Sequence, residues 1–295
     1  MALTFAGTYT ALVTPFRGDG SLDLESLAKH VEWQIASGVD GVVPCGSTGE
    51  SATLSHEEHV HVVRHVVEVA HKRVPVIAGT GSNSTREAIE LTQAARAAGA
   101  DAALLISPYY NKPSQEGIYQ HYAAVAREGG LPTLPYNIPG RTASRLEPET
   151  IARLSRVPGI VAIKESGGDL TATSQTIARS APGFSVLSGD DALTLPMLAI
   201  GGSGVISTTA NAAPREMVEI TRAFRAGDLA RARRAHYALL PLMEALFLET
   251  NPIPVKTALA LLGRIPAATL RLPLTEISKA NRDRLEAALA ELPRA

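Results

Sequence analysis

The sequence predicts an α/β protein, a (β/α)8 or TIM barrel with a C-terminal helical extension. Eight short apolar segments of the kind that form buried parallel strands alternate with eight segments that carry helix signals. The length of 295 residues suits one such barrel with an extension. From residue 227 on, helix signals continue without strand signals. An open, doubly wound sheet is the alternative, but it needs fewer strands. We therefore expect a catalytic barrel over residues 1–226 and a helical domain over residues 227–295.

The predicted strands are short apolar runs bounded by glycine, proline or polar residues. They cover residues 10–13, 41–44, 74–78, 102–106, 133–136, 160–163, 185–187 and 204–206. The helices expected to follow them in turn cover residues 23–37, 55–71, 84–98, 114–127, 148–156, 170–180, 192–199 and 214–226. Ser55 with Glu58, and Ser84 with Glu87, form capping-box patterns at two helix starts. In the C-terminal part, helices are expected over residues 229–249, 255–262 and 275–292.

Composition and charge argue against several classes of function. The net charge of −1, without a basic stripe, argues against nucleic-acid binding. No stretch reaches the length of a transmembrane helix, and the first residues lack the basic and apolar parts of a secretory leader. We therefore expect a cytoplasmic protein that does not contact a membrane. Cys45 is the single cysteine, so an intrachain disulfide is excluded. His61 and His65 share a helical face but lack the glutamate of a zinc-protease helix, so no metal is expected.

Polar residues follow seven of the predicted strands, where such a barrel carries its active site. They lie at residues 46–51, 79–83, 107–111, 136–142, 164, 188–191 and 207–211. The segment 46–51 offers two glycines, hydroxyls and backbone N–H groups before a helix, which suits either an anion site or a plain turn. The segment 79–84 has too few glycines for a dinucleotide fingerprint, so no nicotinamide cofactor is expected.

Lys164 stands where the predicted sixth strand stops. Burial against apolar side chains disfavours the ammonium form of a lysine, and a neutral amine can attack a carbonyl to form a Schiff base. A strand-end lysine that reaches solvent is the alternative. Tyr136, at the end of the fifth strand, carries a phenol suited to proton transfer or to closing the barrel rim. Arg141 is suited to a bidentate carboxylate contact, or is an ordinary surface arginine.

Several motifs together resemble those of the dihydrodipicolinate synthase family, which belongs to the class I pyruvate aldolases. The resemblance extends from Thr10 to about Pro273. The motifs are GSTGESATL from Gly46, AGTG from Ala78, PYYNKP from Pro108, YNIPGRT from Tyr136, IKE from Ile163, SGDD from Ser188, GVIS from Gly204 and NPIPVK from Asn251. The sequence departs from the family at Ser47, where the synthases commonly have threonine and the sialic acid lyases serine.

The resemblance implies a reaction and its catalytic residues. Lys164 would form a Schiff base with pyruvate, and the resulting enamine would attack L-aspartate 4-semialdehyde to give 4-hydroxy-tetrahydrodipicolinate. Tyr136, Thr48 and Tyr110 would form a proton relay, with Tyr110 reaching across from a neighbouring subunit. No cofactor is needed, because the lysine itself provides the electron sink. This is a lyase reaction of lysine and diaminopimelate biosynthesis.

The resemblance also implies binding residues and partners. Ser47, Thr48 and adjacent amides would hold the pyruvate carboxylate, Arg141 the carboxylate of the aldehyde, and the backbone of Ile206 the pyruvate pocket. An L-lysine effector site is implied at Ser51, Ala52, His56, His59, Asn83, Glu87 and Tyr109. The implied assembly is a homotetramer, a dimer of dimers. Two alternatives stay open: another pyruvate aldolase, such as an N-acetylneuraminate lyase or a keto-deoxy-sugar-acid aldolase, and a non-catalytic barrel that only binds.

Overall fold

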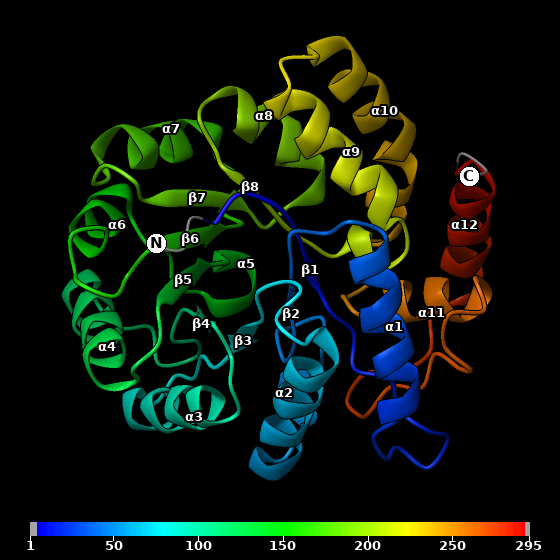
Figure 1. Ribbon diagram of the computed structural model, residues 1–295, viewed down its shortest axis with the longest axis horizontal. Coiled ribbons are helices and arrows are strands. Elements are labelled where there is room, and N and C mark those ends of the chain that lie inside the picture. Colours follow the sequence, from blue (N-terminus) through cyan, green and yellow to red (C-terminus); the bar gives the residue numbers. More distant parts are fainter. Residues whose placement is uncertain (1–4, 293–295) are drawn as a thin grey trace.

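The computed structural model describes residues 5–292, which form the predicted barrel with its C-terminal helices (Figure 1). Residues 1–4, which belong to the N-terminal stretch considered above for a leader, lie outside this range, as do residues 293–295. The parallel strands pair in the order β2-β1-β8-β7-β6-β5-β4-β3. A parallel bridge between Val42 and Val76 joins β2 to β3 and closes the ring. The strands are β1 Gly7–Ala11, β2 Gly41–Val43, β3 Ile77–Gly79, β4 Ala102–Ile106, β5 Thr133–Asn137, β6 Ala162–Glu165, β7 Ser185–Ser188 and β8 Gly204–Ser207.

Helices surround the strands, and three further helices stand on one side of the barrel (Figure 1). The surrounding helices are α1 Leu24–Ala36, α2 His56–Ala70, α3 Thr85–Ala97, α4 Gln115–Glu128, α6 Pro148–Leu154, α7 Leu170–Arg179, α8 Thr194–Ala199 and α9 Pro214–Arg225. The four-residue helix α5 Pro139–Thr142 lies inside this ring (Figure 1). Short 3-10 turns are η1 Ser51–Thr53, η2 Asp191–Leu193 and η3 Thr209–Asn211. The C-terminal helices are α10 Leu229–Ala245, α11 Ile253–Leu261 and α12 Lys279–Ala290. The capping box predicted from Ser55 and Glu58 is present at the start of α2.

The strands bury side chains on both faces, because successive residues of a strand point to opposite sides. One set fills the barrel interior and includes Ala11, Leu104, Leu134 and Ala162. The alternate set packs under the helices and includes Leu105, for example. This alternation determines which polar side chains of the strands can reach the interior.

The first and sixth strands differ from their predicted positions. β1 spans Gly7–Ala11 rather than residues 10–13, because buried threonines fit a strand when their hydroxyls are bonded. Thr10 donates to Gln34 at 2.7 Å, and Thr8 bonds Thr221 at 2.9 Å. β6 spans Ala162–Glu165 rather than residues 160–163, so Lys164 lies inside the strand and not after it. β3 likewise begins at Ile77 and not at residue 74.

The C-terminal helices share one apolar cluster with the last barrel helix. The cluster includes Met217 of α9, Leu239 of α10, Leu259 of α11 and Leu285 of α12. α10 ends at Ala245, four residues before its predicted end, and α12 begins at Lys279 rather than at residue 275. The division into domains at residues 226 and 227 stays a prediction. Within residues 5–292, no helix combines the length and apolarity needed to cross a bilayer.

Candidate active site

A cavity of about 360 Å³ opens at the carboxyl ends of the strands. Five of the residues singled out from the sequence line it: Ser47, Thr48, Tyr136, Arg141 and Lys164. The C-terminal part of the chain also contributes to its wall, through Met243, Glu244, Phe247 and Asn251. The extension is therefore part of the site, a role that its helix signals alone do not predict.

Lys164 lies on the barrel interior because it is two residues from Ala162 on the same face of β6. Its side chain is only 5% exposed, which rules out the alternative of a lysine that reaches solvent. In the β5–β6 register it is paired with Tyr136, and its Nζ lies 4.4 Å from the centre of the Tyr136 ring. The predicted nucleophile and phenol are thus neighbours in the same cavity.

Glu165, the next residue, is buried on the opposite side of β6. Asn137 Nδ2 donates to both of its carboxylate oxygens at 3.0 Å, and the Gly167 N–H donates at 2.6 Å. Burial raises the pKa of Glu165, although these hydrogen bonds oppose the shift. The strand alternation therefore keeps this carboxylate bound to its own partners and separate from the cavity.

The loop after β2 is closed on itself by its own hydrogen bonds. The Gly49 and Ser51 N–H groups donate to the Gly46 carbonyl at 3.1 and 3.4 Å, and the Glu50 N–H donates to the Ser47 carbonyl at 3.2 Å. Among the protein groups of residues 5–292, the N–H groups of Ser47 and Thr48 have no acceptor. Two free N–H groups at a cavity wall suit a carboxylate. The anion-site interpretation of this loop therefore fits its geometry better than the plain turn.

Asn251 connects two of the predicted binding residues. Its Nδ2 donates to Thr48 Oγ1 at 2.8 Å, and its carbonyl accepts from Arg141 Nη2 at 2.9 Å. Thr48 Oγ1 also lies 3.4 Å from Thr208 Oγ1, so its partners in the described chain are these two residues and not Tyr136. The Asn251 Oδ1 atom is buried without a partner among residues 5–292. The motif that contains Asn251 is part of the family resemblance, but the sequence predicts no role for Asn251 itself.

Two of the predicted catalytic and substrate-binding residues do not line the cavity within this single chain. Tyr110 lies in the β4–α4 loop, is 89% exposed and has a left-handed backbone with φ 72°. Ile206 is fully buried in the interior cluster of the barrel, below the cavity. Arg141 does line the cavity, on the four-residue helix α5, which was not predicted as a helix.

Four of the seven residues implied for an effector site contact one another in two pairs. His56 Nε2 bonds Glu87 at 2.9 Å, and Asn83 Nδ2 donates to the Tyr109 carbonyl at 3.2 Å. His59 is buried, its Nε2 bonds the Gly79 carbonyl at 2.7 Å, and burial lowers its pKa. Ser51 and Ala52 lie on η1.

No metal site emerges from the histidine-rich start of α2. Among the residues that the structure describes, no group of three or more His, Cys, Asp or Glu side chains could hold a metal ion. Cys45 is buried and not disulfide-bonded, and burial raises the pKa of its thiol.

The comparisons with known proteins agree with this geometry. The model of the dihydrodipicolinate synthetase family matches residues 4–292. A 4-hydroxy-tetrahydrodipicolinate synthase of Nitratidesulfovibrio vulgaris is 54% identical over 289 residues, which cover 98% of each chain. This relative supports the synthase prediction and not the sugar-acid aldolase alternative.

Solved structures give the same result. A dihydrodipicolinate synthase from Acinetobacter baumannii complexed with pyruvate has 47% identity, a TM-score of 0.95, and coverage of 98% of this chain and 99% of that one. A lysine-bound enzyme from Cyanidioschyzon merolae has 41% identity, a TM-score of 0.94, and coverage of 97% and 98%. With the family model matched along almost the whole sequence, the chain belongs to the dihydrodipicolinate synthetase family.

Proposed function

We propose that this enzyme condenses pyruvate with L-aspartate 4-semialdehyde through a Schiff base on Lys164, giving 4-hydroxy-tetrahydrodipicolinate for lysine and diaminopimelate biosynthesis. The main observation in support of the proposal is the position of Lys164 in the barrel. It is 5% exposed, faces the cavity from β6, and shares that cavity with Tyr136 and with the two free N–H groups of the Ser47–Thr48 loop. The similarity to synthases over nearly the whole chain supports the choice of reaction.

The first half of the reaction builds a nucleophile from pyruvate. The Lys164 amine attacks the ketone carbon, and loss of water leaves an imine. The imine draws electrons from the methyl group, which loses a proton and becomes an enamine. The free N–H groups of Ser47 and Thr48 bind the carboxylate of pyruvate and so fix the ketone beside the amine. Tyr136, whose ring lies 4.4 Å from Nζ, moves the protons that these steps release and require.

The second half joins the two substrates. The enamine carbon attacks the aldehyde carbon, and the aldehyde oxygen takes a proton to become the hydroxyl of the product. The amino group of the second substrate then attacks the imine carbon, closes the ring and displaces the Lys164 amine. Arg141, at the cavity wall, binds the carboxylate of the aldehyde.

Thr48 and Tyr110 of a neighbouring subunit complete the relay from Tyr136 to bulk solvent. This requires the Thr48 hydroxyl, which accepts from Asn251 Nδ2, to turn its own hydrogen to Tyr136. Tyr110 is 89% exposed on its own chain, which suits a side chain that projects into a partner. We place it in a homotetramer formed as a dimer of dimers. Sedimentation at several concentrations, together with the activity of Tyr110→Phe, tests this assignment. A fully active monomer would refute it.

L-lysine is the proposed effector, bound at the surface formed by His56, Asn83, Glu87 and Tyr109 together with His59, Ser51 and Ala52. Two contacts support the proposal: His56 of α2 bonds Glu87 of α3, and Asn83 donates to the Tyr109 carbonyl. Activity titrated with L-lysine at saturating substrates tests the proposal. Absence of inhibition at millimolar concentrations would contradict it.

Borohydride trapping tests the central claim. Wild-type protein incubated with pyruvate and borohydride is expected to gain one reduced adduct per chain, which peptide mass mapping places on Lys164. Lys164→Ala, which removes the amine from the same cavity, should gain none. An adduct on another residue would overturn the mechanism. Comparing L-aspartate 4-semialdehyde with N-acetylmannosamine as the second substrate separates the synthase from a sialic acid lyase.

A further inference from the structure

A buried ion pair joins the loop of residues 46–50, called here the carboxylate-binding loop, to the C-terminal extension. Lys256 Nζ of α11 lies 2.6 Å from Glu50 Oε1, and the two side chains are 0% and 1% exposed. Removing two charges from water is costly, and well-packed apolar residues often stabilise a fold as well or better. An ion pair this deeply buried is therefore weak evidence of a role in stability alone. None of the catalytic steps above uses it.

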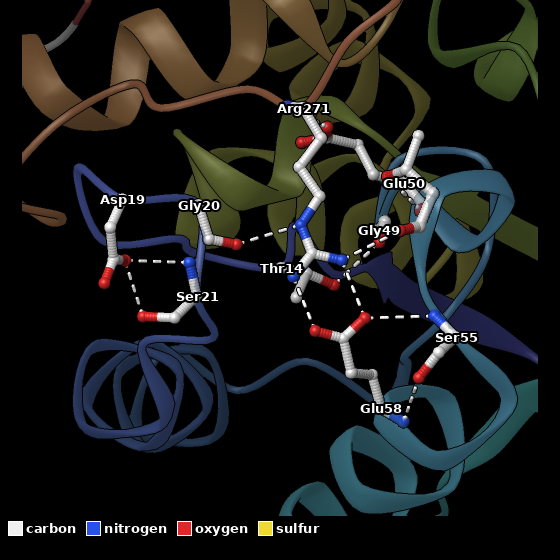
Figure 2. A network of polar contacts seen from close by, with 10 residues as sticks. Thr14, Asp19, Gly20, Ser21, Gly49, Glu50, Ser55, Glu58 and Arg271 are labelled. Carbon is white, nitrogen blue, oxygen red and sulfur yellow. Dashed lines mark hydrogen bonds and ion pairs between the residues drawn. The ribbon is translucent and has the colours of Figure 1, made fainter.

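Arg271 extends this pair into a network that also holds the start of α2 (Figure 2). The Arg271 N–H donates to the second oxygen of Glu50 at 3.1 Å, and its guanidinium donates to Glu58 at 2.7 Å. The Lys256 ammonium and the Arg271 guanidinium lie 4.1 and 4.4 Å from the centre of the Phe16 ring. Both oxygens of Glu50 are thus held by the C-terminal part of the chain.

Glu50 is placed where it can control the shape of the carboxylate-binding loop. It is the last residue before η1 and has a left-handed backbone with φ 52°, a conformation that residues other than glycine adopt at a cost. Its N–H closes the loop on the Ser47 carbonyl at 3.2 Å. Such a conformation persists when surrounding contacts impose it. The contacts from Lys256 and Arg271 are of that kind.

We infer that Lys256 and Arg271 are positioning residues for pyruvate, which act through Glu50 by holding residues 46–50 so that the N–H groups of Ser47 and Thr48 face Lys164. The inference rests on the proposed function, because it assigns the pyruvate carboxylate to that loop. Neither residue lines the cavity, so any effect on pyruvate binding is indirect.

The competing explanation is that the network only stabilises the fold. Two variants separate the explanations: Lys256→Met alone, and the double variant Glu50→Gln with Lys256→Met. Lys256→Met leaves the Glu50 charge buried and without its main partner, so both the melting temperature and pyruvate binding should suffer. The double variant removes both charges, which should restore much of the melting temperature. It does not restore the contact from Lys256 that holds residue 50 in place.

The expected result is a separation of stability from the KM for pyruvate. In both variants the KM for pyruvate should rise about tenfold or more, and the rate of borohydride trapping at low pyruvate should fall to match. The KM for L-aspartate 4-semialdehyde should stay within about twofold, since Arg141 is held by Asn251 and not by this network. If Lys256→Met does not fold, the double variant alone tests the inference, because Arg271 contacts Glu50 through its backbone N–H, which Arg271→Ala would leave in place.

Leu259→Ala is the matched control, because Leu259 is fully buried in the same helix α11 but contacts the C-terminal apolar cluster. It should lower the melting temperature and leave the KM for pyruvate unchanged. A wild-type KM for pyruvate in the double variant, or an equal rise in Leu259→Ala, would overturn the inference. Failure of the proposed function would look different, because the wild-type protein itself would then give no pyruvate adduct on Lys164.

Discussion

Gly189, directly after β7, controls the space that the Lys164 side chain occupies. A Cβ at this position would lie 2.7 Å from Lys164 Cε, 3.0 Å from Lys164 Cγ and 2.0 Å from Ser166 Oγ. Ordinary contacts for a Cβ begin at 3.4 Å, so in Gly189→Ala the lysine Cε must move by about 0.7 Å and the serine must rotate away. The backbone of Gly189 lies outside the left-handed region, so alanine is excluded by crowding and not by backbone strain.

The size of the effect follows from how catalysis depends on position. A displacement of about 1 Å at a reacting group can lower a rate by about 100-fold. We therefore expect Gly189→Ala to slow borohydride trapping of pyruvate by between about 10- and 100-fold. Overpacking should also lower the stability of the fold by about 1–3 kcal/mol. The trapping rate is measured by intact mass at temperatures where the variant is folded.

Gly140→Ala provides the matched control for this prediction. Gly140 lies on α5 at the same rim of the barrel, and a Cβ there would meet no atom within 4 Å. Its trapping rate should equal that of the wild-type protein. If Gly189→Ala traps pyruvate at the wild-type rate, Lys164 does not need the position that it has in the structure, and the reasoning fails.

Three further predictions concern other parts of the molecule. Arg141→Ala should raise the KM for L-aspartate 4-semialdehyde by about 10- to 150-fold, because one charge-assisted hydrogen bond is lost. The rate of pyruvate trapping should stay unchanged, and a rise in the KM for pyruvate alone would contradict the prediction. Asn251→Ala should lower kcat/KM for both substrates in steady-state assays, because Asn251 contacts both Thr48 and Arg141. An effect on one substrate only would show that Asn251 does not connect the two binding residues. Burial lowers the pKa of His30 and His121 to about 4. As the pH falls below about 6.5, these histidines therefore bind protons in the unfolded chain while they stay neutral in the folded chain. Denaturant unfolding should therefore show a loss of roughly 3 kcal/mol per histidine between pH 7 and pH 4, and a smaller loss in His121→Gln than in the wild-type protein; equal losses would argue against it.

The residues that could be found from the sequence are those whose signal is local. A barrel of parallel strands places its functional side chains at the carboxyl ends of those strands, so a polar residue after a buried run is already a candidate. Lys164, Tyr136 and the loop at Ser47 and Thr48 were found in this way, and the structure brings them together in one cavity. The strand alternation then determines that Lys164 faces inward.

The residues that were missed act over long distances in the sequence. Asn251 meets Thr48 across 203 positions, and Lys256 meets Glu50 across 206. Nothing in the local pattern of an asparagine before a helix, or of a lysine inside one, indicates such partners. The start of the first strand was misplaced for a similar reason, because Thr8 looks polar until its helix partner Thr221 is known.

The way the C-terminal extension reaches the cavity explains why the barrel alone does not complete the site. The loop after β2 presents the N–H groups that bind an anion, but its own hydrogen bonds fix only its internal shape. Its orientation relative to Lys164 depends on what holds its far end, and there both oxygens of Glu50 are bound by groups from α11 and the segment before α12. Asn251 makes the corresponding contact to Thr48 at the cavity itself. Loss of the Lys256–Glu50 contact should therefore alter pyruvate binding before it alters the barrel, which places the extension within the catalytic unit.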